Sequence, residues 1–234
     1  MKYILLLCTA FVVLNSCDYT SGSGNIVTEK RAAVNFTGIN VSGSFDVEVK
    51  LGSVEEVVVE ADDNVIKFVE TSVSGNTLKI RTEGLHSLHN VHLKVYITVP
   101  ELKSIKASAS AEVKVLDVMK GDGGLSFDVS SSAGIEAEVD APEVDAEASS
   151  SGSIILGGKT KSYKVRVSSS ADIKSFELLS ESANASANSS GSVELHASIS
   201  LDADASSSGS IEYRGGATVK KNISSSGSVE KKGD

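Results

Sequence analysis

Three histidines, His86, His89 and His92, are separated by three residues each, a spacing that would align them on one face of a helix as zinc ligands. The segment that begins at His89, HNVHLKVYITV, instead has the composition and alternation of a strand. On a strand, residues three apart point to opposite faces. No cysteine lies nearby in the sequence, so we predict no metal site and interpret the histidines as surface residues.

Two carboxylates, Asp202 and Asp204, lie two residues apart and would share one outward face of a strand. Polysaccharide-cleaving enzymes use paired carboxylates about 5–9.5 Å apart, one with a raised pKa. Lys220 follows Asp202 one repeat later, so we interpret these acids as paired with neighbouring side chains. Serines are abundant, but His196 is the only histidine after residue 101, and no Gly-x-Ser-x-Gly motif occurs. We therefore predict no catalytic residues, no cofactor and no enzyme activity.

The first 16 residues predict a secretory signal peptide, because Lys2 precedes an apolar stretch over residues 4–14 that is too short to span a bilayer. The stretch ends in Leu-Asn-Ser-Cys, which resembles the bacterial lipobox. That resemblance implies cleavage before Cys17 and a lipid on Cys17, which would anchor the chain on a membrane. Cys8 lies in the discarded segment, so the mature chain has no intramolecular disulfide.

Residues 17–25 are expected to form the lipidated cysteine and a flexible tether, because DYTSGSGN is rich in serine and glycine. A single domain is expected over residues 26–234. The formal charge of the chain is −9, and removing residues 1–16 removes one lysine and no acid, which gives −10. A chain this acidic is not expected to bind nucleic acid.

A Ser-Ser-Gly-Ser phrase followed by Val or Ile recurs through the second half of the chain. The apolar residues that close successive phrases are Val113, Ile135, Ile154, Ile173, Val193, Ile211 and Val229, separated by 22, 19, 19, 20, 18 and 18 residues. A nearly fixed period of this length indicates a solenoid of stacked units. Each unit reads as a strand, a Ser/Gly corner and a second strand, and seven units at about 4.8 Å would make a rod about 30 Å long.

The outward positions of the repeats carry charges that we expect to pair between neighbouring units. Asp145 and Glu147 precede Lys164 and Arg166 by one repeat, as Asp202 precedes Lys220. We expect the stacked corner serines to form hydrogen bonds along the rod. In the last unit Lys221 falls at an inward position, which is typical of a terminal strand protected against aggregation.

Residues 26–100 predict less regular strands, including the alternating run FDVEVKL, and end at Pro100. One short helix is expected over residues 62–69, with Asp62, Asp63 and Asn64 available as caps.

Two segments carry a family resemblance. The first is FTGINV, with Gly38-Ile39-Asn40, followed by SGSFDVEV; the second is VYITVPELKSIKASASAEV from Val95. Together with the serine-rich repeats they resemble the auto-transporter adhesin head GIN domain family over roughly residues 30–230. The resemblance implies an all-β, right-handed parallel β-helix or β-solenoid, a location in the cell envelope and no catalytic residues.

The sequence thus predicts a non-enzymatic outer-membrane lipoprotein, facing the periplasm or exposed on the surface, that works as an adhesin-like module with a glycan or protein ligand. Two alternatives remain open: a periplasmic structural or stress-related lipoprotein with a protein partner, and a polysaccharide-active β-helix enzyme.

Overall fold

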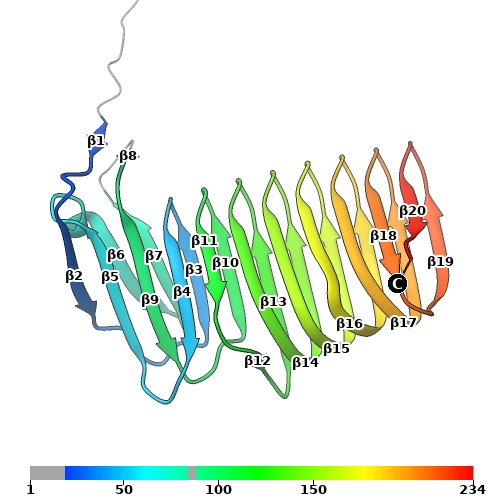
Figure 1. Cartoon of the computed structure of the whole chain (residues 1–234), viewed down its shortest axis with the longest axis horizontal. Coiled ribbons are helices and arrows are strands. Elements are labelled where there is room, and N and C mark those ends of the chain that lie inside the picture. The colour runs from blue at the N-terminus through cyan, green and yellow to red at the C-terminus, as the bar shows by residue number, and fades with distance from the viewer. Residues whose placement is uncertain (1–18, 84–87, 234) are drawn as a thin grey trace, which may run out of the picture.

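The repeats stack as a parallel β-solenoid in the computed structural model, which describes residues 19–83 and 88–233 (Figure 1). The predicted signal peptide, Cys17 and His86 lie outside the described residues. Each turn has two arms, and equivalent arms of successive turns pair in parallel to form two facing sheets. This arrangement confirms the predicted fold class. In the described ranges, no helix is both long enough and apolar enough to cross a membrane.

Four long strands bend once and contribute to both sheets. They are β14 (Gly134–Ala148), β15 (Ser153–Val167), β16 (Asp172–Ala187) and β17 (Ser192–Ala205). The other turns use shorter strands, namely β10 (Ser104–Ser108), β11 (Glu112–Val115), β12 (Met119–Lys120), β13 (Gly124–Val129), β18 (Ser210–Arg214), β19 (Thr218–Ile223) and β20 (Ser228–Lys231). The predicted closing residues stack in register from Val113 to Val229, so the period of the sequence is the period of the rod.

The N-terminal turns are not stacked in chain order. The strands concerned are β3 (Gly38–Ser42), β4 (Asp46–Leu51), β7 (Thr77–Thr82) and β9 (Leu93–Val99). The earlier pair, β3 and β4, lies between the later pair, β7 and β9, and the first repeat strands, β10 and β11. Three antiparallel strands then close this end of the rod: β2 (Ile26–Arg31), β5 (Glu56–Asp62) and β6 (Val69–Ser74).

The helix expected over residues 62–69 is only a single 3₁₀ turn, Ile66–Phe68. Its N-cap residue is Val65, and no side chain caps it. The prediction was wrong because the polar residues at 62–64 find partners elsewhere in the chain, as described below.

The core lies between the two sheets and is filled by the inward member of each alternating pair. Alanines dominate one arm of the later turns, as at Ala146, Ala185 and Ala203, which are fully buried. Tyr163 is the largest of these inward side chains, and its hydroxyl donates to Ser175 Oγ at 3.1 Å. Ser175 in turn donates to the carbonyl oxygen of Glu194 at 2.6 Å, so this buried polar chain is satisfied.

Seven tight turns form one long edge of the rod, and each has two central residues with left-handed backbone. In Ser149–Gly152, for example, Ser150 and Ser151 have φ of 51° and 63°, and the Gly152 N–H donates to the Ser149 carbonyl at 2.9 Å. The Ser151 N–H donates to the carbonyl of Ser169 in the next turn at 3.1 Å. The predicted ladder of corner serines along the rod is therefore present. It runs mainly through backbone groups, and in the last turn the Ser228 hydroxyl also donates to Ser210 Oγ at 3.1 Å.

The C-terminal turn closes with a charged side chain. Lys221 is in register with Ala203, at an inward position as predicted. Its Nζ donates to the Val229 carbonyl oxygen at 2.8 Å and lies 5.3 Å from the centre of the Tyr213 ring. An ammonium group thus covers the open end of the alanine-lined core.

A candidate ligand-binding groove

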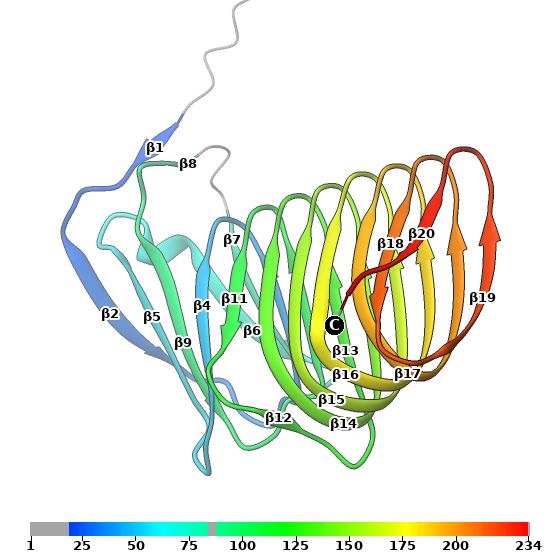
Figure 2. The same ribbon diagram turned by 45° about the vertical axis from the view of Figure 1, so that its right-hand side comes forward.

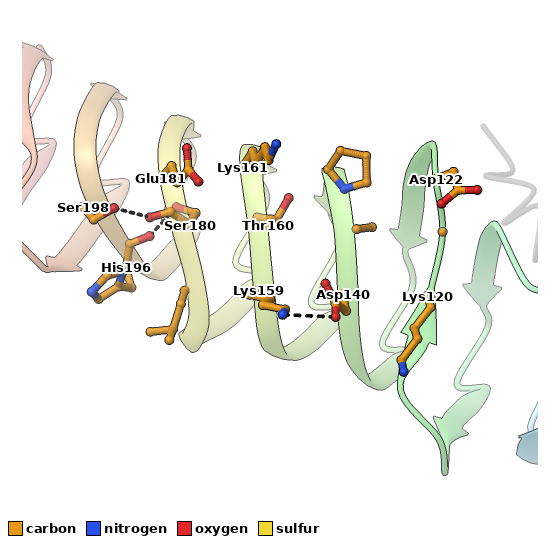
Figure 3. A pocket seen from close by; sticks show the side chains of 14 residues that line it. Lys120, Asp122, Asp140, Lys159, Thr160, Lys161, Ser180, Glu181, His196 and Ser198 are labelled. Carbon is orange, nitrogen blue, oxygen red and sulfur yellow. Dashed lines mark hydrogen bonds and ion pairs between the residues drawn. The ribbon is translucent and has the colours of Figure 1, made fainter.

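The bends of the long strands lie at the edge opposite the serine turns (Figure 1) and form an open groove of about 860 Å³ (Figure 3). Residues 159–161 of β15 and residues 179–181 of β16 occupy its middle. β14 and β12 extend the groove toward the N-terminal end of the rod, and β17 extends it toward the C-terminal end. The groove is therefore a product of stacking, since no single repeat contains it.

Hydroxyl groups at the base of the groove are used within the fold. Thr160 and Ser180 are buried. Thr160 Oγ1 donates to the Ser162 carbonyl at 3.1 Å, and Ser180 Oγ donates to the carbonyl of His196. Ser198 Oγ donates to the Ser180 carbonyl at 3.2 Å (Figure 3). These bonds fix the bends, so the base is rigid and the groups available to a ligand stand on the rims.

The rims carry six charged side chains: Lys120, Asp122, Asp140, Lys159, Lys161 and Glu181. Asp140 and Lys159 are stacked in register and form an ion pair of 3.3 Å. The other four have no ion pair with any described residue. Among the described lysines between residues 101 and 220, every one except Lys120 and Lys161 pairs with a carboxylate. Within this stretch of the repeats, the unpaired lysines thus gather at the groove.

His196 forms part of the C-terminal end of the groove. Its Nδ1 is enclosed and has no hydrogen-bond partner among the described residues. Leu179, stacked against His196, leaves an apolar side chain in the groove that is 56% exposed. The site therefore combines opposite charges, an imidazole and an apolar contact.

Sequence comparison decides the family. A family model described as "Putative auto-transporter adhesin, head GIN domain" matches residues 35–217, which is well over half of the chain. The chain belongs to this family. The expected resemblance is confirmed, and no match was found among curated proteins.

Solved structures share the fold of this head GIN domain at low sequence identity. A "putative adhesin" from Bacteroides fragilis is 19% identical, with a TM-score of 0.83 over 91% of this chain and 98% of that one. A "putative adhesin" from Parabacteroides merdae is 22% identical, with a TM-score of 0.75 over 92% and 100%. A "putative lipid binding protein" from Parabacteroides distasonis is 24% identical, with the same TM-score and coverage.

The paired acids that sequence reasoning weighed as catalytic groups lie on the outer sheet face of the head GIN domain, not in the groove. Lys220 Nζ lies 3.0 Å from Asp202 Oδ2, and Asn222 Nδ2 donates to Asp204 Oδ1 at 2.7 Å. The pairing expected for Asp202 is confirmed.

The second predicted ion pair is also confirmed. Arg166 Nη2 lies 3.0 Å from Asp145 Oδ1 and 2.9 Å from Glu147 Oε2, and Lys164 lies 4.0 Å from Asp145. The hydrogen bond from Arg166 to Glu147 is the main reason that the pKa of the Arg166 guanidinium is raised.

The described histidines are not brought together. His92 Nε2 lies 2.7 Å from Glu60 Oε1, whereas the His89 ring packs edge-on against Tyr19 with ring centres 6.2 Å apart. Across residues 19–83 and 88–233, no group of three potential metal ligands is found.

The sequence predicted neither the groove nor a set of hydrogen bonds that holds the segment after Cys17 against the domain. The side chains of Asp62, Asp63 and Asn64 make these bonds, and we call the three residues the clasp. Asp62, which is buried, accepts from the Gly24 and His92 N–H groups, both at 2.7 Å. Asp63 accepts from Ser23 Oγ at 2.6 Å and Asn25 Nδ2 at 2.7 Å, and these bonds lower the pKa of its carboxyl group.

The clasp continues toward the N-terminus. The Ser23 N–H donates to Asn64 Oδ1 at 3.1 Å, and Asn64 Nδ2 donates to the Ser21 carbonyl at 2.8 Å. β1 (Thr20–Ser21) also pairs in parallel with β8 (Leu88–His89). From Thr20 onward, the segment that composition predicted to be a flexible tether is fixed to the domain.

Proposed function

We propose that this chain is a non-enzymatic, lipid-anchored binding module of the bacterial cell envelope that takes its ligand in the groove. The observation that carries the binding role is the set of four unpaired charges on the groove rims, in a region where the other lysines are paired. The head GIN family, which is described as an adhesin family, supports the same role.

The lipobox resemblance supports a lipid anchor at Cys17. Because the clasp holds the segment that follows Cys17 against the domain, such an anchor would also limit how far the domain can lie from the membrane. Only Asp18 and Tyr19 separate Cys17 from β1. A fully extended chain covers about 3.3–3.6 Å per residue, so three steps reach about 10 Å. β1 lies at the antiparallel end of the rod, level with the serine-turn edge (Figures 1 and 2). That end of the domain would be held close to the membrane surface.

Metabolic labelling with an alkyne-bearing fatty acid tests the anchor. The wild-type chain and a Cys8→Ala variant should incorporate the label, and a Cys17→Ala variant should not and should leave the membrane fraction. Equal labelling of the Cys17→Ala variant would contradict the lipid assignment.

Protease treatment of intact and lysed cells tests the location. Digestion on intact cells supports a surface-exposed module that contacts other cells or host material. Protection until lysis favours a module facing the periplasm with a partner inside the envelope, and would exclude adhesion to other cells.

A further inference from the structure

The four unpaired charges of the groove are balanced in sign. Lys120 and Lys161 are positive, Asp122 and Glu181 are negative, and Asp140 and Lys159 neutralise each other. The groove is therefore electrically neutral on a chain whose formal charge is −9. A purely anionic ligand would be attracted by the two lysines and repelled by the two carboxylates. A purely cationic ligand would be attracted by the two carboxylates and repelled by the two lysines.

The charges are spread along the rod. Register places Lys120 beside Asp140, Asp140 beside Lys159, and Lys159 beside Leu179, which makes three steps from β12 to β16. At about 4.8 Å per step the charges span about 14 Å. An extended polypeptide covers this length with four to five residues. The spread favours a linear ligand over a compact one.

The remaining lining favours polypeptide over sugar. Among the described residues no Phe, Tyr or Trp lines the groove, and the His196 imidazole is its one aromatic ring, so a sugar would find little aromatic surface to stack on. Leu179 and Pro142 instead offer small apolar contacts of the kind that aliphatic parts of side chains use. An extended peptide supplies alternating side chains with both signs of charge on a single strand.

We infer that the groove, as the ligand site of the proposed function on which this inference rests, binds an extended polypeptide segment bearing both acidic and basic side chains. Acidic side chains of the partner lie against Lys120 and Lys161. Basic side chains lie against Asp122 and Glu181. Because these pairs are solvent-exposed, they set selectivity and salt dependence more than raw affinity.

The test uses the purified full-length protein and fluorescein-labelled octapeptides in fluorescence polarisation at low ionic strength. The peptides are alternating Lys-Glu, all-Lys, all-Glu and an uncharged Ser-Gly repeat, with carboxymethyl chitosan as an unlabelled competitor that carries both charges on a sugar chain. The Lys-Glu peptide should bind most tightly, and 1 M NaCl should abolish its binding. The double variant Lys120→Ala with Lys161→Ala should bind it about three- to tenfold more weakly.

A matched control removes two paired lysines elsewhere, in the variant Lys106→Ala with Lys114→Ala, and should leave the affinity within about twofold. Equal binding of the all-Lys or all-Glu peptide would overturn the inference, as would equal weakening by the control variant. Binding of carboxymethyl chitosan without the peptides would assign the groove to a polysaccharide instead. Since this assay needs neither the lipid nor a cell, its failure is distinct from failure of the anchor at Cys17.

Discussion

The Tyr163 hydroxyl crosses the alanine-lined core and donates to Ser175 Oγ at 3.1 Å, where both side chains are almost completely buried. Burial raises the pKa of the Tyr163 phenol, so the group stays protonated and acts as a donor. Ser175 passes the interaction on to the Glu194 carbonyl in the next turn. These two inward side chains, Tyr163 and Ser175, thus link β15, β16 and β17.

The variant Tyr163→Phe should be destabilised by only about 0.5–1.5 kcal/mol, because Ser175 keeps its own acceptor and no buried donor is orphaned. Tyr163→Ala should cost about 3–5 kcal/mol, because it leaves a cavity in the core. Urea denaturation followed by circular dichroism measures both changes. Equal losses in the two variants would contradict this division between hydrogen bond and packing.

The variant Lys221→Leu should associate end to end. The ammonium group now covers the open end of the core and bonds to Val229, and inward charges at an exposed edge oppose strand pairing between molecules. Sedimentation velocity should show dimers or longer oligomers that the wild-type chain lacks at the same concentration. Lys220→Leu is the matched control, since Lys220 points outward and pairs with Asp202, and it should sediment as the wild type does.

The variant Asp62→Ala should release the clasp. It removes the acceptor of two backbone N–H groups, Gly24 and His92, and should cost about 1–3 kcal/mol. Hydrogen exchange at these two amides should speed up strongly, with little change in the serine turns. Asp117→Ala, which removes a more exposed acceptor of one backbone N–H, should have a smaller effect on stability. Unchanged exchange at Gly24 would show that the clasp does not hold the segment.

The variant Glu112→Gln should stabilise the domain at neutral pH. Partial burial, and then the neighbouring Asp46 carboxylate in register, raise the pKa of Glu112. An acid whose pKa is raised on folding disfavours the folded state when it is ionised, so wild-type stability from this group rises as the pH falls through that pKa. The gain should be about 0.5 kcal/mol or less at pH 7 and should vanish near pH 4. Thermal melts across this range measure it, and a gain that persists at pH 4 would point to another cause.

The sequence by itself determined the solenoid, because strands that stack in parallel register repeat their inward residues at equivalent positions in each unit. The Val113 to Val229 series, the inward position of Lys221 and the pairing of Asp202 with Lys220 all follow from that period. Each of these three features can be predicted from a residue and the residue at the equivalent position one repeat later.

Tertiary structure decided the features that join positions with no fixed spacing. β3 lies between β7 and β10 because a parallel sheet can accept strands out of chain order. Asp62 and Asp63 have the local pattern of helix caps, but their partners lie 38 to 40 residues earlier in the chain or, at His92, 30 residues later. The groove draws its charges from the bends of separate repeats, where the pairing register shifts between β15 and β16 and again between β16 and β17. Only folding brings those bends side by side.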